Sequence, residues 1–311
     1  MDTAVAVDQL VRKFGDITAV DGLTFQVGSG ELFGIVGPDG AGKTTTLRML
    51  AGVLRPTSGD ARVADISIVE NPEGVKHHIA YMSQRFGLYT DLTVRENIEF
   101  YADLYRVPRR ERPARLERLY AFSGLGPFED RLAGQLSGGM KQKLGLCAAL
   151  IHEPDILLLD EPTFGVDPIS RRDLWLIVHE MVARGVTVVV STAYLDEAER
   201  CDRVMLIHNG TAAMLDTPEA LQARLQGLVF AVTCDAPRRA RDLLRRLPEV
   251  GQAALFGDVI HAMLRGGERG LPAIRAALTA ADIAVSAIES IEPSLEDVFI
   301  DLVQGQEIGD G

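Results

Sequence analysis

Residues 37–45, with the sequence GPDGAGKTT, have the residue types and spacing of a loop that binds phosphate. Glycines let backbone N–H groups close around phosphate oxygens, and a helix that begins at the lysine adds its positive N-terminal end. Lys43 is placed to reach the outer phosphates of a nucleotide, and the Thr44 hydroxyl can ligate Mg²⁺. A glycine turn with only a structural role is the alternative. The apolar run LFGIV before the loop and the helical pattern after it favour phosphate binding.

A pair of acidic residues follows the apolar run in DILLLDEP, residues 155–162. At the end of a strand, Asp160 could hold Mg²⁺ through water, and Glu161 could orient or activate an attacking water molecule. An acidic pair that only caps a strand is common, so this pattern alone is weak. Together with the phosphate-binding loop upstream, it predicts the chemistry of nucleotide hydrolysis.

A third candidate is LSGGMKQK, residues 136–143, where Ser137, Gly138 and Gly139 precede a helical pattern. Bare backbone before a helix is a second possible anion site, although an ordinary helix cap explains it as well. Two phosphate sites on one chain predict that two copies enclose nucleotide between them.

Short apolar runs alternate with helical patterns and must position these residues. Strands buried on both faces and separated by helices indicate an α/β domain with a mostly parallel sheet. Residues 86–150 are largely helical and form an expected helical insertion. The expected strands are 31–37, 78–83, 155–160, 185–192 and 203–208, and helices are expected at 43–51, 168–183 and 195–201.

The pattern changes after residue 227. Residues 228–304 have a β-α-β-β-α-β order, which predicts a small α+β domain of ferredoxin-like type. Residues 1–227 would then form the first domain, and 305–311 a flexible tail.

Composition narrows the possible partners and location. The 311 residues include 32 Lys and Arg against 44 Asp and Glu, a formal net charge of -12, which argues against nucleic-acid binding. Three widely separated cysteines are typical of buried thiols in a reducing compartment. We find no signal peptide and no apolar window of about 18 residues, so a cytoplasmic protein without its own membrane span is expected.

In residues 1 to about 225, the chain resembles the ATP-binding subunits of ABC transporters, and the motifs occur in the family's order. This resemblance implies the fold of a RecA-like P-loop cassette, the cofactors ATP and Mg²⁺, and the activity of ATP hydrolysis. GPDGAGKTTTL resembles Walker A, YMSQRFGLY the Q-loop, LSGGMKQK the signature, ILLLDEP Walker B and FGVDP the D-loop. The nucleotide-binding residues implied are Phe14 (stacked on adenine), Gly37, Asp39, Gly40, Ala41, Gly42, Lys43, Thr44, Thr45, Ser137, Gly138, Gly139 and Asp167.

The resemblance also implies the catalytic residues, the metal ligands and the partners. Glu161 and Gln84 would be catalytic, and Thr44, Gln84 and Asp160 would hold the metal. The expected partners are a second cassette and an integral membrane permease, which would contact residues 86–89 at the inner face of the cell membrane. The last third is similar to the C-terminal extension of daunorubicin-resistance-like exporters, where it would regulate or dimerise.

Two positions depart from the family pattern. Ala193 in STAYLDEAE stands where the family usually has a histidine that bonds the γ-phosphate. The N-terminal cassettes of tandem exporter ATPases, which the chain resembles, also have such a substitution. Asp39 replaces a commoner asparagine and would either weaken ATP binding or cap a turn.

Besides an exporter ATPase, the sequence allows a nucleotide-operated clamp that hydrolyses ATP slowly. A non-transport ABC protein is disfavoured by the single cassette and the acidic charge.

Overall fold

The computed structural model describes residues 2–84, 87–225 and 227–307. The chain divides into two compact units, one formed by the residues up to 194 together with 201–212, and the other by 195–200 and the residues from 213 onward. Within the described residues, no helix is long and apolar enough to cross a membrane.

A six-stranded sheet forms the centre of the first unit, in the order β10-β9-β3-β8-β7-β6. The pairs from β9 to β6 are parallel, and the strands β3, β7 and β8 are buried along their whole length. The expected strands are therefore confirmed. The bounds are β3 (Leu32–Val36), β6 (Ile79–Met82), β7 (Ile156–Asp160), β8 (Thr187–Thr192), β9 (Arg203–His208) and β10 (Thr211–Asp216), the last of which crosses the division at residue 212.

A second, antiparallel sheet in this unit was not predicted from the sequence. Its strand order is β2-β1-β4-β5, and its bounds are β1 (Thr3–Phe14), β2 (Ile17–Gly28), β4 (Ser58–Val63) and β5 (Ile66–Ser67). The strands β1 and β2 mix buried and exposed positions, and their pairing is interrupted by several register shifts. The half-buried, irregular pattern is the physical reason that no continuous apolar run marks these strands.

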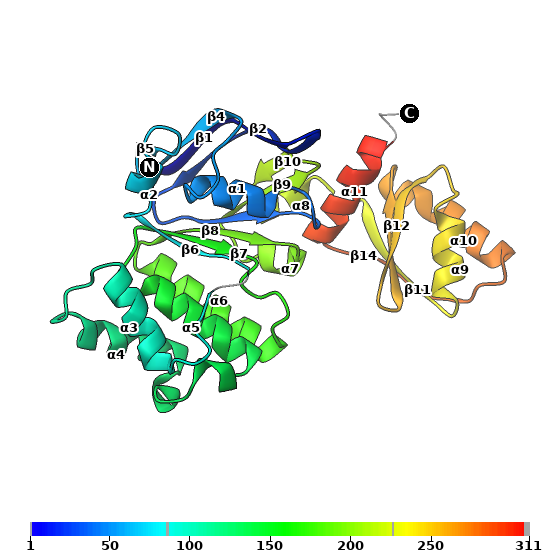
Figure 1. The fold of residues 1–311 in the computed structure, drawn as a ribbon. Helices are drawn as coiled ribbons and strands as arrows, with labels where there is room; N and C mark the ends of the chain where they lie inside the picture. The colour runs from blue at the N-terminus through cyan, green and yellow to red at the C-terminus, as the bar shows by residue number, and fades with distance from the viewer. Residues whose placement is uncertain (1, 85–86, 226, 308–311) are drawn as a thin grey trace. The chain divides into compact units, whose positions relative to one another are not determined.

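Helices cover both faces of the six-stranded sheet. The helix α1 packs on β7 and β8 from one side, while α5 and α6 pack on β6 and β8 from the other (Figure 1). Helical segments α3, α4 and α5 occupy the expected helical insertion, and Trp175 on α6 is buried. The bounds are α1 (Lys43–Leu50), α2 (Pro72–Val75), α3 (Val94–Leu104), α4 (Arg112–Ser123), η1 (Gly126–Phe128), η2 (Ala133–Gln135), α5 (Gly138–Leu150) and α6 (Pro168–Ala183).

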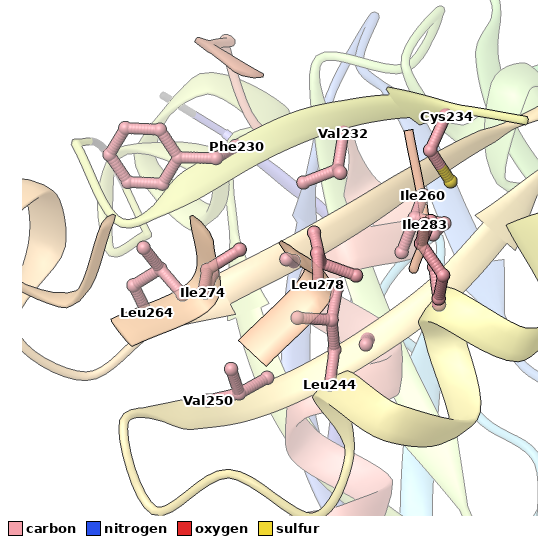
Figure 2. Close-up of a cluster of buried hydrophobic side chains, with 13 residues drawn as sticks. Phe230, Val232, Cys234, Leu244, Val250, Ile260, Leu264, Ile274, Leu278 and Ile283 are labelled. Atoms are coloured by element: carbon pink, nitrogen blue, oxygen red, sulfur yellow. The ribbon is translucent and has the colours of Figure 1, made fainter. Parts of the chain in front are cut away.

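The second unit contains the predicted β-α-β-β-α-β order, and its antiparallel sheet has the order β12-β13-β11-β14. Figure 2 shows its core, in which Phe230 of β11 lies with apolar side chains of α9, α10 and the neighbouring strands. The helix α11 reaches Glu307, inside the expected tail, and 308–311 lie outside the described residues. The bounds are α7 (Leu195–Ala198), α8 (Pro218–Ala223), β11 (Val229–Cys234), α9 (Pro237–Leu244), β12 (Val250–Phe256), β13 (Val259–Leu264), η3 (Gly267–Gly270), α10 (Leu271–Ala280), β14 (Val285–Ser290) and α11 (Leu295–Glu307).

Candidate functional site

The P-loop, residues 37–45, connects the end of β3 to the start of α1. A Cβ atom added at Gly37 would lie 2.2 Å from the carbonyl oxygen of Ile207, so only glycine fits there. Gly42 precedes α1 with a φ of 107°, and a Cβ there would lie 2.5 Å from the carbonyl oxygen of Ala19. These glycines let the backbone fold into a tight turn whose N–H groups precede a helix, the arrangement of an anion site.

The other P-loop side chains differ in exposure. Asp39 and Gly40 are exposed at the tip of the loop, Ala41 is buried, and Thr45 is half-buried on the first turn of α1. The carboxylate of Asp39 therefore projects where solvent solvates its charge.

Lys43 is buried, with only 4% of its surface exposed, and its ammonium is fully engaged. Its Nζ donates hydrogen bonds to the carbonyl oxygens of Gly37 at 2.8 Å and Pro38 at 3.0 Å, and it lies 3.1 Å from Oε1 of Glu161. A buried ammonium needs such partners because its desolvation is otherwise costly. Anionic oxygens bound in the loop would compete with these partners for the same charge.

Asp160, the last residue of β7, is completely buried and accepts hydrogen bonds from three hydroxyls. Its Oδ1 accepts from Oγ1 of Thr44 at 2.9 Å and from Oγ of Ser191 at 2.8 Å, and its Oδ2 accepts from the Tyr81 hydroxyl at 3.2 Å. Burial, and then the negative charge of Asp160, raise the pKa of Tyr81 to about 12. The three donors satisfy a carboxylate that would otherwise be destabilised by its burial.

Glu161 adopts a left-handed backbone conformation with a φ of 49° and is 8% exposed. Its Oε2 accepts a hydrogen bond from Nε2 of Gln84 at 2.9 Å, while its other oxygen faces Lys43. A non-glycine residue with positive φ is uncommon, and such strained positions cluster at functional sites. The structure therefore brings together Gln84, Glu161 and Lys43, which lie far apart in the chain.

Ala193 follows the end of β8 and is exposed. The preceding residue, Thr192, accepts a hydrogen bond at its carbonyl from the N–H of Gly37, at 3.3 Å. A methyl group thus stands directly beyond a contact with the P-loop, and a methyl can neither donate nor accept a hydrogen bond.

Phe14 ends β1 and is 45% exposed, so it does not belong to the core. It pairs with Ile17 across the turn to β2, and Ala19, two residues further, approaches Gly42. The guanidinium of Arg12 lies 4.4 Å from the centre of its ring. An exposed aromatic ring on the β1–β2 hairpin, which approaches the P-loop at Ala19, is a suitable surface for stacking.

Ser137 caps the start of α5, because its Oγ accepts a hydrogen bond from the N–H of Met140. A Cβ added at Gly139 would lie 2.1 Å from Oγ of Ser170 on α6. Asp167 caps α6, and the Ser170 N–H that bonds it lowers the pKa of Asp167. The expected signature and D-loop therefore touch each other, whereas within the described residues Ser137 to Gly139 form no hydrogen bond to the P-loop.

Sequence reasoning missed Ser191 and Tyr81, both of which bond Asp160. A usable signal was present, because each interrupts an apolar strand run with a hydroxyl near the carboxyl end of the strand.

Among the residues expected at a permease contact, Phe86 lies outside the described residues, and Tyr89 is 48% exposed and packs edge-on against Phe100.

A parallel α/β sheet with a glycine loop, a lysine and a threonine after β3, and an acidic pair at the end of β7, defines a P-loop nucleotide-binding domain. Comparison with known proteins narrows the class. The family model described as "ABC transporter" matches residues 20–164. The probable multidrug ABC transporter ATP-binding protein YbhF of Escherichia coli K12 is 44% identical over 310 residues, covering 98% of this chain and 53% of that protein.

For two further similar proteins, the match covers most of their own length. The daunorubicin resistance ATP-binding protein DrrA2 of Streptomyces coeruleorubidus is 34% identical over 304 residues, which are 96% of this chain and 94% of that protein. The dimeric post-hydrolysis structure of the ATP-binding cassette MJ0796 bound to ADP and Pi has a TM-score of 0.63 at 26% identity, covering 68% of this chain and 98% of that one. The chain belongs to the family of ABC transporter ATP-binding proteins. It spans about half the length of YbhF.

Proposed function

We propose that this chain is the ATP-binding subunit of an ABC exporter. It binds MgATP, hydrolyses it between two cassettes, and drives transport through separate integral membrane permease subunits at the inner face of the cell membrane. The observation that carries the proposal is the contact of Lys43 and Thr44, at the start of α1, with Glu161 and Asp160, at the end of β7. The names of the relatives support an exporter, since they refer to multidrug transport and drug resistance.

The residues of the site have distinct proposed roles. The P-loop backbone and Lys43 bind the β- and γ-phosphates, and Glu161, oriented by Gln84, acts on the attacking water. The ring of Phe14 stacks on adenine. Ser137, Gly138, Gly139 and Asp167 complete the site of a second cassette, so nucleotide lies between two copies or between this chain and a relative.

Mg²⁺ fits the donor set beside Asp160. No group of three or more His, Cys, Asp and Glu that could hold a metal occurs in the part of the chain that the structure describes. Thr44 and Asp160 offer a hydroxyl and a carboxylate 2.9 Å apart, and Gln84 is close by at Glu161. Mg²⁺ is usually bound by one or two carboxylates together with substrate phosphates and water, so such a partial oxygen site is suitable. When bound, the ion neutralises charge on the phosphates.

The central test is the substitution Lys43→Ala. Removing the ammonium should abolish ATP binding, because it takes away the cation that would neutralise the charge of the β- and γ-phosphates. The control is Lys76→Ala, since Lys76 is a surface lysine with a 42% exposed side chain that pairs with Glu73. Titration with a fluorescent ATP analogue measures both variants. An unchanged affinity of the Lys43 variant would contradict the assignment of the P-loop.

A second candidate function is favoured by Ala193. A clamp that closes on ATP but hydrolyses it slowly would use the same binding residues without a donor at this position. Comparing steady-state phosphate release with ATP-dependent dimerisation separates the two functions, because a clamp dimerises fully while releasing little phosphate.

A further inference from the structure

The hydroxyl of Ser191 joins the two acidic residues of the site. It donates a hydrogen bond to Oδ1 of Asp160 at 2.8 Å and accepts one from the backbone N–H of Glu161 at 3.1 Å. Ser191 and Asp160 are both fully buried. A serine hydroxyl has one proton to donate, so this geometry commits that proton to Asp160.

The sheet fixes this contact. Strands β7 and β8 are parallel, and Asp160 is the register partner of Ser191. Partners in register point to the same face of a sheet, so the strand pairing places the hydroxyl beside the carboxylate. The next strand, β3, pairs its Ile35 with Ser191 and leads directly into the P-loop.

Ser191 also contacts the backbone of Glu161 where that backbone is strained. The N–H of Glu161 lies 3.1 Å from both the carbonyl oxygen and the Oγ of Ser191, at a residue whose φ is 49°. A left-handed conformation persists at a non-glycine residue only when the surrounding contacts hold it. The direction of the Glu161 side chain depends on this backbone, so Ser191 affects where the carboxylate points.

The other two donors to Asp160 are less suited to hold it during the reaction. Thr44 shares Oδ1 with Ser191, but its hydroxyl oxygen is the one proposed to ligate the metal. Tyr81 bonds the opposite oxygen at the longer distance of 3.2 Å. Ser191 is therefore the donor that would still hold Oδ1 if the Thr44 hydroxyl ligated a metal ion.

We propose that Ser191 is a positioning residue, which orients the Asp160 carboxylate toward the metal and the Glu161 side chain toward the attacking water. The inference rests on the proposed function of MgATP hydrolysis. Loss of a partner that orients a metal ligand typically costs 10- to 100-fold in metal affinity or activity. We expect Ser191→Ala to lower both the Mn²⁺ affinity of the nucleotide complex and kcat by about 10- to 100-fold.

The test compares three variants of the full chain with the unmodified protein. Mn²⁺ replaces Mg²⁺ so that free metal can be measured by electron paramagnetic resonance at a fixed ATP concentration. ATP binding without metal is measured in parallel and should not change in Ser191→Ala. Ser191→Thr keeps the hydroxyl and should restore Mn²⁺ affinity and kcat.

The matched control is Thr187→Val, which removes a buried hydroxyl from the opposite end of β8, where Oγ1 of Thr187 accepts a hydrogen bond from the N–H of Gly30. It should lower the thermal midpoint without changing Mn²⁺ affinity or kcat. The inference is overturned if Ser191→Ala keeps normal Mn²⁺ affinity and kcat, or if Thr187→Val lowers them equally. Failure of the unmodified protein to bind MgATP would instead overturn the proposed function and the inference with it.

Discussion

Ala193→His is expected to raise the rate of ATP hydrolysis at least ten-fold. Residue 193 is exposed and follows Thr192, whose carbonyl bonds Gly37 of the P-loop, so an added imidazole would stand beside the proposed position of the γ-phosphate. Because the site is exposed, the substitution should change the free energy of unfolding by no more than about 0.5 kcal/mol. The change in rate would then reflect the chemistry of the site.

The magnitude follows from the loss of one donor. Removing a single hydrogen-bond donor aimed at developing charge typically costs about 10²–10³ in rate. An imidazole added at an exposed position is held by fewer neighbours than a buried one, so we expect only part of that factor of about 10²–10³ to be regained. A ten-fold rise corresponds to about 1.4 kcal/mol of transition-state stabilisation.

The assay is the initial rate of phosphate release at saturating MgATP, at protein concentrations where light scattering shows the ATP-dependent dimer. The matched control is Ala183→His, which adds the same side chain at an exposed alanine at the far end of α6. Equal rates for the Ala193 variant and the unmodified protein would refute the reasoning. Fast hydrolysis by the unmodified protein alone would show that another group supplies the contact.

Three further predictions concern stability. Gly139→Ala should destabilise the fold by about 1–3 kcal/mol, because the new Cβ would lie 2.1 Å from Oγ of Ser170. The control Gly138→Ala should be tolerated, since its Cβ meets no atom within 4 Å, and equal denaturation midpoints for the two variants would contradict the prediction. Phe230→Ala should cost the second unit about 3–5 kcal/mol in denaturant unfolding without changing ATP affinity, because the ring is only 2% exposed in that unit's own core. In the unmodified protein, the free energy of unfolding should fall between pH 10.0 and about 12, because Tyr81 loses its proton in the unfolded chain at a lower pH than in the folded one. Tyr81→Phe should make this fall less steep, and superimposable plots of unfolding free energy against pH for the two proteins would refute this.

The sequence by itself determined the P-loop, the acidic pair and the type of most strands. The P-loop is a contiguous motif, so its turn and its lysine are encoded by local spacing. Strands buried on both faces appear as continuous apolar runs, which is why β3, β7 and β8 could be predicted. The alternation of strand and helix patterns after residue 227 likewise determined the β-α-β-β-α-β order.

Only the tertiary structure decided how the site is assembled. Ser191 and Tyr81 lie 31 and 79 residues from Asp160 in the chain, and they meet it only because three parallel strands end side by side in a fixed register. The antiparallel sheet of β1, β2, β4 and β5 could not be predicted from the sequence for a related reason. Its irregular, half-buried strands are specified by the strands with which they pair. Local spacing encodes turns and strand types, whereas strand order and register come from packing between distant segments, and here that packing surrounds Asp160 with its hydroxyl donors.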